Sequence, residues 1–438
     1  MIKRQKPTES GCLNYQNNHC GLMKSVLLAL WGDPLGWKRV KYSMNNEKYL
    51  SITSSSVISR NKNIDKSFIF IPDSIFPELL NSVDNLKDCF KSKLIDHIKN
   101  YDTESADFIN KSDVNIFPSM GSYYKDKLYR YDVDIKFLYS YFYVSILKSI
   151  EFFNDIDTFL IDTTHGVNFM QLIFTESVRH ACNTYSLNYR RNIKLEFYNS
   201  DPYYKSDDTI LNINTIKIDL IDSKNILSVI SRDFLNKYKD NKNSIKNYFK
   251  KINRDGLEIY IKACSIMVQS DIIPYLLYVI DNKHQCFNID QENNFSITIK
   301  NDGNLINVQQ DFPDSIKINI ESLAFIDSLR AVYNSMKSHN KYNIKDIYDL
   351  TDIFFGSDSD ITFLKNELKN IKNNKMRTHG RYIDLSEFTR NFKAHAGLLD
   401  YICNVDSNCI EFKTASVNNK KIDMDFIVES LVRSHVKL

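Results

Sequence analysis

The chain has 438 residues, so length alone predicts two or three domains, and an apolar share of 43% is enough for sizeable cores. The formal charge of +3 is close to balance, so net charge does not mark a nucleic-acid binder, and any basic groove must be local. The 8 cysteines show no C-x-x-C pair and no zinc-type spacing, which indicates reduced cytosolic thiols, and no apolar run approaches the roughly 18 residues of a membrane span.

The first half alternates short apolar runs with long amphipathic segments. Residues 1–22 carry no pattern and are interpreted as an N-terminal extension before Met23. Strands separated by helices indicate βαβ units and a mainly parallel sheet. The expected strands are 26–31, 68–71, 114–117, 158–162 and 193–198, with an antiparallel pair near 200–222 at the sheet edge. The expected helices are 73–101, 132–153 and 166–185.

After about residue 224 the strand signal fades and helical periodicity dominates. The exception is 287–308, where alternating apolar residues around Asn301-Asp302-Gly303 predict an inserted β-hairpin whose role is not readable. The expected helices are 226–238, 244–252, 257–280, 320–337, 344–355, 361–370 and 385–402. The predicted division is an extension at 1–22, an α/β domain at 23–223, a helical linker at 224–284 and a helical domain at 285–438.

Two loops of the first half follow strands, at the edge where open parallel sheets bind ligands. The loop 31–37 comes directly after the first strand, and the loop 162–168 joins a strand to a helix N-terminus, which favours an anion. The alternative is a capped turn with a structurally hydrogen-bonded histidine. The candidate ligand-binding residues are Trp31, Gly32, Asp33, Pro34, Asp162, Thr163, Thr164, His165, Gly166 and Asn168.

Neither loop has the spacing of a conventional nucleotide enzyme. The chain contains no G-x-x-x-x-G-K-[ST] run, and the loop 162–168 lacks G-x-G-x-x-G. A dinucleotide-binding or nucleoside-triphosphate enzyme is therefore disfavoured.

The segment 389–397 carries the candidate catalytic residues Arg390, Asn391 and His395. A histidine can act as general base or acid, and an arginine can hold a phosphate and stabilise its growing charge. RNA supplies its own nucleophile, the 2′-hydroxyl, so this pair suffices for cleavage without a metal. The expected products are a 2′,3′-cyclic phosphate and a 5′-hydroxyl. The competing interpretation is a chance R-x-x-x-x-H pattern in a structural helix.

Helical geometry constrains this pair. Residues five apart lie about 140° apart around a helix, so Arg390 and His395 do not share a face, whereas Asn391 and His395 do. Either Arg390 wraps around the helix or a second chain completes the site. The small residues Ala394, Ala396 and Gly397 would permit a partner helix to approach, as in a two-fold dimer.

Together these motifs resemble the CRISPR-associated CARF–HEPN ribonucleases that carry the DxTHG motif. The resemblance rests on the run 30–37, on Asp162-Thr163-Thr164-His165-Gly166 with Asn168, and on the run 390–397. It implies a Rossmann-like CARF sensor followed by a helical HEPN nuclease that contains the hairpin. It implies that Arg390 and His395 are the catalytic pair, with Asn391 as the polar neighbour.

The resemblance also implies partners and regulation. The activator would be cyclic tetra-adenylate, with cyclic hexa-adenylate as the second choice, and the substrate would be single-stranded RNA. The protein would be a cytoplasmic homodimer, or a higher oligomer, whose region 226–280 transmits the signal. Three alternatives stay open: a ligand-sensing transcriptional regulator that cuts nothing, a HEPN toxin held inactive by a protein partner, and a sensor that also degrades its own ligand.

Overall fold

The fold is described by a computed structural model of residues 25–435. The residues within that range that are not described are 82–85, 168, 204–208, 253, 255, 290, 292–294, 337–342, 356–357, 373–384, 400, 407–408 and 418–419. None of the helices within the described residues combines the length and apolar character of a membrane span.

The first half is built on an eight-stranded sheet with the order β3-β2-β10-β9-β8-β1-β4-β5. The five strands from β9 to β5 run parallel, which confirms the mainly parallel sheet. β10 pairs antiparallel with β9, but the expected edge position is wrong, because β2 pairs in parallel with the other side of β10 and β3 lies beyond it. The strands are β1 (Ser25–Leu30), β2 (Val40–Met44), β3 (Glu47–Ser51), β4 (Lys66–Pro72), β5 (Asp113–Phe117), β8 (Thr158–Asp162), β9 (Ile193–Ser200) and β10 (Ile210–Ile221).

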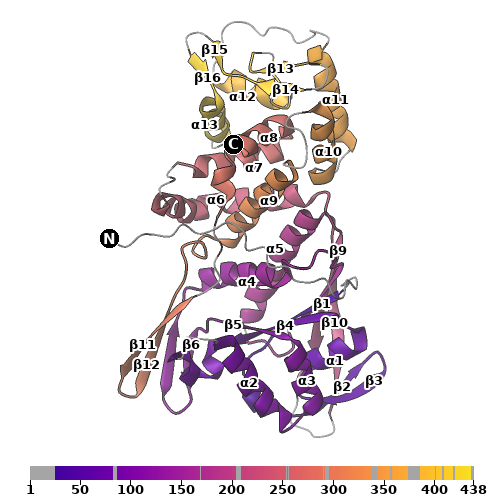
Figure 1. The fold of residues 1–438 in the computed structure, drawn as a ribbon, viewed down its shortest axis with the longest axis vertical. Helices are drawn as coiled ribbons and strands as arrows, with labels where there is room; N and C mark the ends of the chain where they lie inside the picture. Colours follow the sequence, from indigo (N-terminus) through magenta and orange to yellow (C-terminus); the bar gives the residue numbers. More distant parts are fainter. Residues whose placement is uncertain are drawn as a thin grey trace, which may run out of the picture.

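Helices cover both faces of this sheet, which explains why β1 is apolar throughout rather than alternating. Val26, Leu28 and Leu30 pack with α4 (Ile135–Ile150) and α5 (Met170–Tyr189) on one face. Ala29 packs on the opposite face, among residues of α2 (Leu86–Lys99) and α3 (Thr103–Lys111). Leu27 also points to that side and packs with α1 (Ser54–Lys62). Figure 1 shows these layers in the indigo and magenta part of the ribbon.

Two expected helix boundaries in this half are wrong, and one hairpin was missed. The helix expected at 73–101 is broken into two short 3-10 turns, Asp73–Ile75 and Pro77–Asn81, followed by α2, because proline lacks an N–H and starts a new turn. Helix α5 begins at Met170 and not at residue 166. The β2–β3 hairpin was not predicted, although Asn45 and Asn46 both adopt the positive φ angles of a tight hairpin turn.

The second half is mainly helical, as expected, and its ribbon in Figure 1 runs from rose through orange to yellow. Its central helix α9 packs against α4, α5 and α6, so the two halves share one continuous apolar core. The helices are α6 (Ile226–Lys251), α7 (Glu258–Gln269), α8 (Ile273–Asn282), α9 (Ile320–Met336), α10 (Ile344–Phe354), α11 (Asp358–Lys372), α12 (Leu385–Ala394) and α13 (Met424–His435). The short strands are β13 (Cys403–Val405), β14 (Ile410–Phe412), β15 (Ala415–Val417) and β16 (Lys420–Ile422).

Several helix boundaries here differ from expectation. The two helices expected at 226–238 and 244–252 form the single helix α6. The helix expected at 257–280 breaks at Asp271, which has a φ of 52°, before Pro274 opens the first turn of α8. The helix expected at 385–402 stops at Ala394 because Ala396 and Gly397 turn left-handed and the Gly397 N–H donates to the Phe392 carbonyl.

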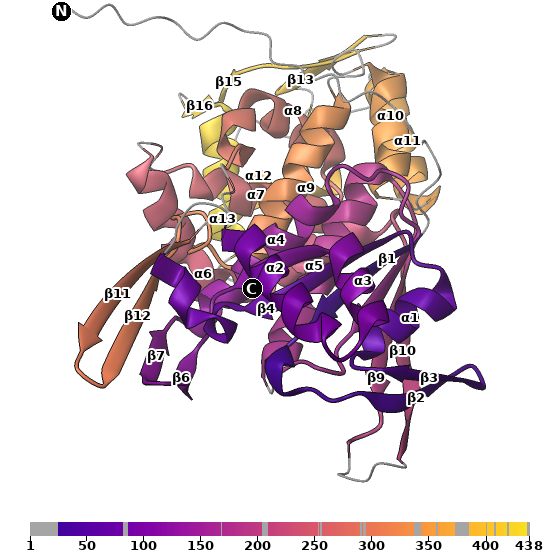
Figure 2. The same ribbon diagram turned by 60° about the horizontal axis from the view of Figure 1, so that its bottom comes forward.

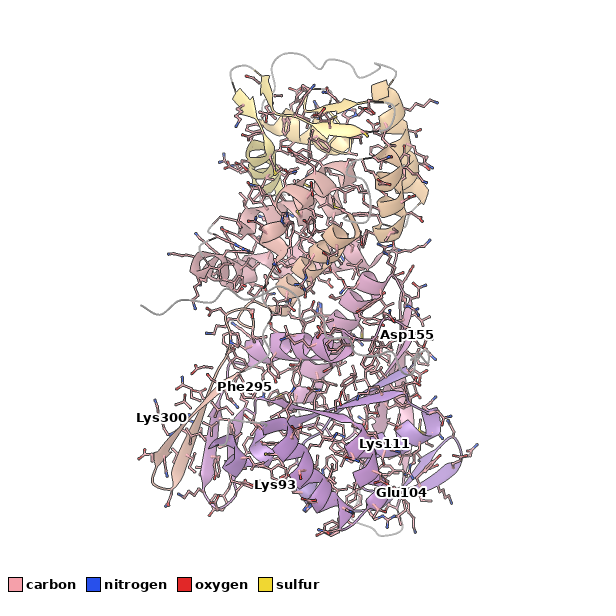
Figure 3. All side chains as sticks on the ribbon, viewed as in Figure 1. Lys93, Glu104, Lys111, Asp155, Phe295 and Lys300 are labelled. Atoms are coloured by element: carbon pink, nitrogen blue, oxygen red, sulfur yellow. The ribbon has the colours of Figure 1, made fainter. Side chains whose placement is uncertain are left out.

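A hairpin of β11 (Ser296–Asp302) and β12 (Leu305–Asp311) leaves the helical half and reaches back to the first half. There β12 pairs in parallel with β7 (Leu128–Asp132), which pairs with β6 (Gly121–Tyr124), so a second sheet of four strands is formed by both halves. Figure 2 shows the two hairpins side by side. In Figure 3, Phe295 lies at the base of this hairpin and Lys300 near its outer end.

Candidate functional sites

The two sequence-predicted loops of the first half meet at the carboxyl ends of β1 and β8. The Gly32 N–H donates to the His165 carbonyl over 2.7 Å. A Cβ on Gly32 would lie 2.6 Å from the Val167 side chain, and a Cβ on Gly166 would lie 2.6 Å from the Gln171 side chain. Gly32 therefore permits the close approach of the two loops, and Gly166 permits its own loop to pack against Gln171 of α5.

Asp162 and Trp31 form the buried back wall of this region rather than its surface. Asp162 is 1% exposed, and its Oδ2 accepts hydrogen bonds from Ser54 (2.7 Å) and Ser55 (2.6 Å). The Ser55 hydroxyl in turn accepts from Trp31 Nε1 over 2.9 Å. The Thr164 N–H donates to Asp162 Oδ1 over 3.0 Å, so the carboxylate orders the loop that follows β8. These two predicted residues position the site and do not line it.

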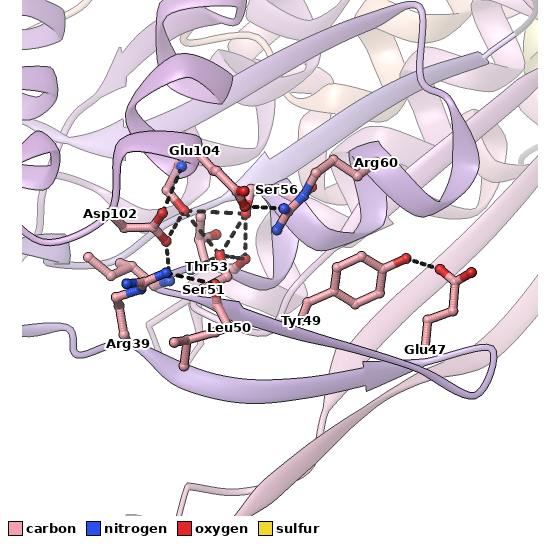
Figure 4. Close-up of polar contacts among 12 residues, drawn as sticks. Arg39, Glu47, Tyr49, Leu50, Ser51, Thr53, Ser56, Arg60, Asp102 and Glu104 are labelled. Atoms are coloured by element: carbon pink, nitrogen blue, oxygen red, sulfur yellow. Dashed lines mark hydrogen bonds and ion pairs between the residues drawn. The ribbon is translucent and has the colours of Figure 1, made fainter.

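A second polar cluster fixes the turn that presents Ser54, as Figure 4 shows. The Ser51 hydroxyl lies 2.7 Å from that of Ser56 and 3.0 Å from that of Ser105, and the Ile52 N–H donates to Asp102 over 2.9 Å. Burial favours the protonated form of Asp102, but the hydrogen bonds from Ser105 and Ile52 outweigh it and lower the pKa of this carboxyl. The start of α1 is therefore held rigidly beneath the loops.

His165 is held as a neutral acceptor. Its Nε2 lies 3.2 Å from the Ser54 backbone nitrogen and 3.2 Å from the Tyr42 hydroxyl. Because a backbone N–H can only donate, Nε2 accepts and the ring proton lies on Nδ1. Burial lowers the pKa of His165 to about 4 against the opposing effect of the Asp162 charge. The ring also stacks on Trp37, with centroids 4.0 Å apart.

A pocket of about 680 Å³ opens above these groups. Of the predicted residues, Thr164 and His165 line it. Sequence reasoning missed most of the rest, which comes from the loop after β1, from β2 and from the end of β9. The lining residues are Gly36, Trp37, Lys38, Val40, Tyr42, Ile52, Thr164, His165, Asn199, Ser200, Asp201, Pro202, Tyr203 and Leu211.

The remaining predicted residues of the first half lie beside this pocket. Asp33 caps the 3-10 turn Pro34–Gly36 by accepting from the Leu35 N–H, and it pairs with Lys125 over 3.2 Å. Asp33 and Lys125 line a neighbouring cavity of about 80 Å³. Pro34 is buried and begins the turn, and Thr163 is buried with its hydroxyl bonded to the Tyr198 carbonyl. Asn168 lies outside the described residues.

The predicted catalytic residues of the second half lie on α12 and just beyond it. Phe388 and Phe392 are fully buried and anchor the helix, and Phe392 packs edge-to-face on Tyr275. Arg390 is exposed on the opposite side, where it can reach a ligand. His395 follows the last helical residue, and its N–H still donates to the carbonyl of Asn391.

Glu367 on α11 is a site residue that sequence reasoning missed. Its Oε2 lies 2.9 Å from His395 Nδ1, and its side chain is only 11% exposed. A carboxylate in this position accepts the Nδ1 proton, so the neutral ring carries its lone pair on Nε2. The contact joins residues 28 positions apart in the sequence. Glu367 is not part of a local motif, so its position beside His395 could not be predicted.

No described contact joins Arg390 to His395, and a helix places two residues with this spacing about 140° apart. One chain therefore presents a base with its carboxylate just after α12, and presents on α12 an arginine that makes no described contact with that base. The arrangement can deprotonate a hydroxyl at His395, while the phosphate clamp must come from a rotated Arg390 or from a second chain.

Comparison with known proteins finds a family model that matches most of the first half. Residues 26–202 match the family model described as "CRISPR system endoribonuclease Csx1, CARF domain". Among characterised proteins, the chain is similar to the CRISPR system endoribonuclease Csx1 of Methanocaldococcus jannaschii, with 26% identity over 416 residues. That alignment covers 86% of this chain and 85% of the relative, so the likeness extends well beyond the CARF domain.

Proposed function

We propose that the chain is a CRISPR-associated endoribonuclease in which the CARF domain senses a cyclic oligoadenylate and a helical HEPN domain cuts single-stranded RNA. The observation that carries the proposal is the His395–Glu367 pair. It places a histidine with a defined tautomer beside a helix that presents Arg390, in a chain similar over most of its length to an endoribonuclease. The proposed enzyme is cytoplasmic and works as a homodimer or a higher oligomer.

The proposed reaction uses the 2′-hydroxyl of RNA. His395 Nε2 removes the 2′-OH proton, the 2′-oxygen attacks the adjacent phosphorus, and the bond from phosphorus to the 5′-oxygen breaks. The leaving oxygen takes up a proton, which yields a 2′,3′-cyclic phosphate and a 5′-hydroxyl. Arg390 would stabilise the charge on the phosphate oxygens, and Asn391 would bind one of them. Glu367 would hold the ring and stabilise the imidazolium.

The proposed activator site is the pocket above β1 and β8. Trp37 and Tyr203 offer aromatic faces for adenine, Lys38 offers a cation for phosphate, and Nδ1 of the neutral His165 is a donor. A volume of about 680 Å³ is typical of one small-molecule site, so two chains would share a ring of four adenylates. Cyclic tetra-adenylate is the first candidate and cyclic hexa-adenylate the second.

The test is cleavage of labelled single-stranded RNA in EDTA, with and without cyclic tetra-adenylate. We expect cleavage only with the activator, and none by the His395→Ala variant, which should still bind the activator. Cyclic hexa-adenylate and a divalent metal are the next additions if no cleavage is seen. If the protein binds an activator but never cuts RNA, a ligand-sensing regulator becomes the better description.

A further inference from the structure

The outer edge of β10 is open beyond its short pairing with β2. That pairing is parallel and involves only Ile210, Leu211 and Asn212. Among the described strands, only β2 and β9 pair with β10, so the side of β10 that faces away from β9 has no described strand beside it from Ile213 to Ile221. An unpaired edge presents backbone N–H and C=O groups that can form hydrogen bonds with a further strand.

The open part of β10 exposes large apolar side chains. Ile216, Ile218 and Leu220 are 59%, 52% and 80% exposed. The charged residues Lys217 and Asp219 alternate with them, and their side chains pair with each other over 2.9 Å. A solvent-facing edge usually avoids such a row of apolar side chains, because the row favours association with another strand.

The order of these five residues is complementary to itself. When two copies of one strand pair antiparallel about a two-fold axis, the axis must pass through a residue, because residues that lie opposite each other share a face. With Ile218 on the axis, Lys217 lies opposite Asp219 of the partner. Ile216 then lies opposite Leu220 of the partner. An axis through Lys217 or through Asp219 would instead place two like charges opposite each other, which is destabilising.

We propose that β10 pairs with β10 of a second copy of this chain, with Ile218 on the two-fold axis, so that two sheets join into one. Arg179 of α5 lies 3.1 Å from Asp219, which holds this carboxylate in place at the edge. The axis is perpendicular to the sheet, so the carboxyl ends of the parallel strands in the two copies would point in opposite directions. The contact is therefore different from one in which two copies share an activator pocket, and it would join such dimers into a larger assembly.

The experiment measures the mass of the assembly by light scattering after size-exclusion chromatography, without activator or RNA. We expect the parent to have at least twice the mass of Ile218→Arg, which places two like charges on the axis. Lys217→Asp should lower the mass equally, because it sets carboxylates opposite each other. A mixture of Lys217→Asp and Asp219→Lys should regain the parent mass, because each introduced charge then faces its opposite. Lys300→Asp, on the hairpin β11–β12, is the matched control and should keep the parent mass (Figure 3).

The variants test the surface and the register separately. If Ile218→Arg and Lys217→Asp both keep the mass of the parent, β10 is not an interface and the inference is wrong. If both lower the mass but the mixture stays low, the proposed register is wrong. Ile218 and the Lys217 side chain are about half exposed, so these two variants should fold even if Asp219→Lys does not. The mass does not depend on RNA cleavage, so the proposed nuclease function stands or falls separately.

Discussion

At the scale of single residues, the most informative contact is the one between Glu367 and His395. A buried carboxylate that holds a base does two things: it fixes the tautomer and it stabilises the charge that forms when the base takes a proton. Replacement by glutamine keeps a hydrogen-bond acceptor and removes the charge. The Glu367→Gln substitution therefore tests the contribution of the negative charge separately from that of the hydrogen bond.

We expect Glu367→Gln to lower kcat about tenfold to a hundredfold and to leave KM nearly unchanged, because the ring stays in place while the imidazolium loses its counter-charge. The measurement is steady-state cleavage of a short RNA at saturating activator. Glu429→Gln changes an exposed glutamate on α13 and serves as the control. Equal kcat values for the two variants would remove Glu367 from the mechanism.

His165 yields a pH prediction. Its folded-state pKa is about 4, against 6.5 for an unperturbed histidine, so between these values the unfolded chain binds the proton and the folded chain does not. The free energy of unfolding therefore falls as pH decreases from 6.5 toward 4, by up to about 3 kcal/mol. We expect the Tm of the parent to fall more steeply over this range than the Tm of His165→Gln. Parallel Tm profiles would contradict a neutral His165.

At the scale of elements, the hairpin β11–β12 joins the helical half to the α/β half. Gln310 at the end of β12 donates to Asp73, and the other Asp73 oxygen accepts from the Ser119 N–H over 2.9 Å. Asp73 is fully buried at the carboxyl end of β4, and burial raises its pKa to about 6 despite these hydrogen bonds. A strand of the helical half thus ends at the carboxyl end of β4 in the first half.

We expect Gln310→Leu to weaken the coupling between activator and nuclease. The substitution leaves a buried carboxylate short of a donor, which costs about 1–3 kcal/mol, and it removes the polar link to the edge of β4. The ratio of cleavage rates with and without activator should fall, while the activator Kd changes little. Gln309→Leu alters the exposed neighbour on the same strand and is the control. An unchanged ratio would show that the hairpin only adds stability.

The elements that could be predicted from sequence were those with local signals. The parallel strands are continuous apolar runs, and the turn at Asn301-Asp302-Gly303 predicts a hairpin where β11 and β12 lie. Helix ends were missed where the stop depends on backbone angles, as at Ala396 and Gly397, or where a proline restarts a turn, as at Pro77. The pairing of β12 with β7 could not be predicted, because alternation shows that a strand has two faces but not which strand lies beside it.

The candidate sites likewise contain residues that could be predicted from the sequence and residues that could not. The loops after β1 and β8 could be placed because topology brings the carboxyl ends of parallel strands together. The pocket lining from Tyr42 and from Asn199 to Tyr203 could not, because it depends on how the β2–β3 hairpin folds over the edge. Glu367 could not be found either, because its helix meets α12 only in three dimensions.

At the scale of the whole molecule, one core runs through both halves. Asp327 of α9 is 3% exposed, and it accepts hydrogen bonds from Tyr143 of α4 over 2.7 Å and from Gln291 over 2.7 and 2.8 Å. Helix α9 is therefore joined directly to α4 of the first half, so a displacement of α4 would displace α9 as well. Arg390 on α12 and His395 just after it share no described contact within one chain, so the source of the phosphate clamp is tested by combining variants.

This arrangement predicts complementation between inactive variants. Arg390→Ala and His395→Ala should each abolish cleavage. If each site combines Arg390 of one chain with His395 of its partner, mixing the two variants after subunit exchange should restore activity at about a quarter of the sites. The measurement is the cleavage rate of the exchanged mixture relative to the parent. A mixture as inactive as its components would place both groups in a single chain.

The pairing of β12 with β7 also sets an order of events during synthesis. Gln309 pairs opposite Asp132, so this sheet joins positions that leave the ribosome about 180 residues apart, or roughly 10 to 40 s at bacterial rates. Until then β7 has an open edge, and Asp73 lacks the donor that Gln310 provides. The second sheet of the α/β half cannot be completed before much of the helical half has emerged. A nascent chain that stops before β12 would therefore lack the four-stranded sheet and would leave Asp73 without the Gln310 donor.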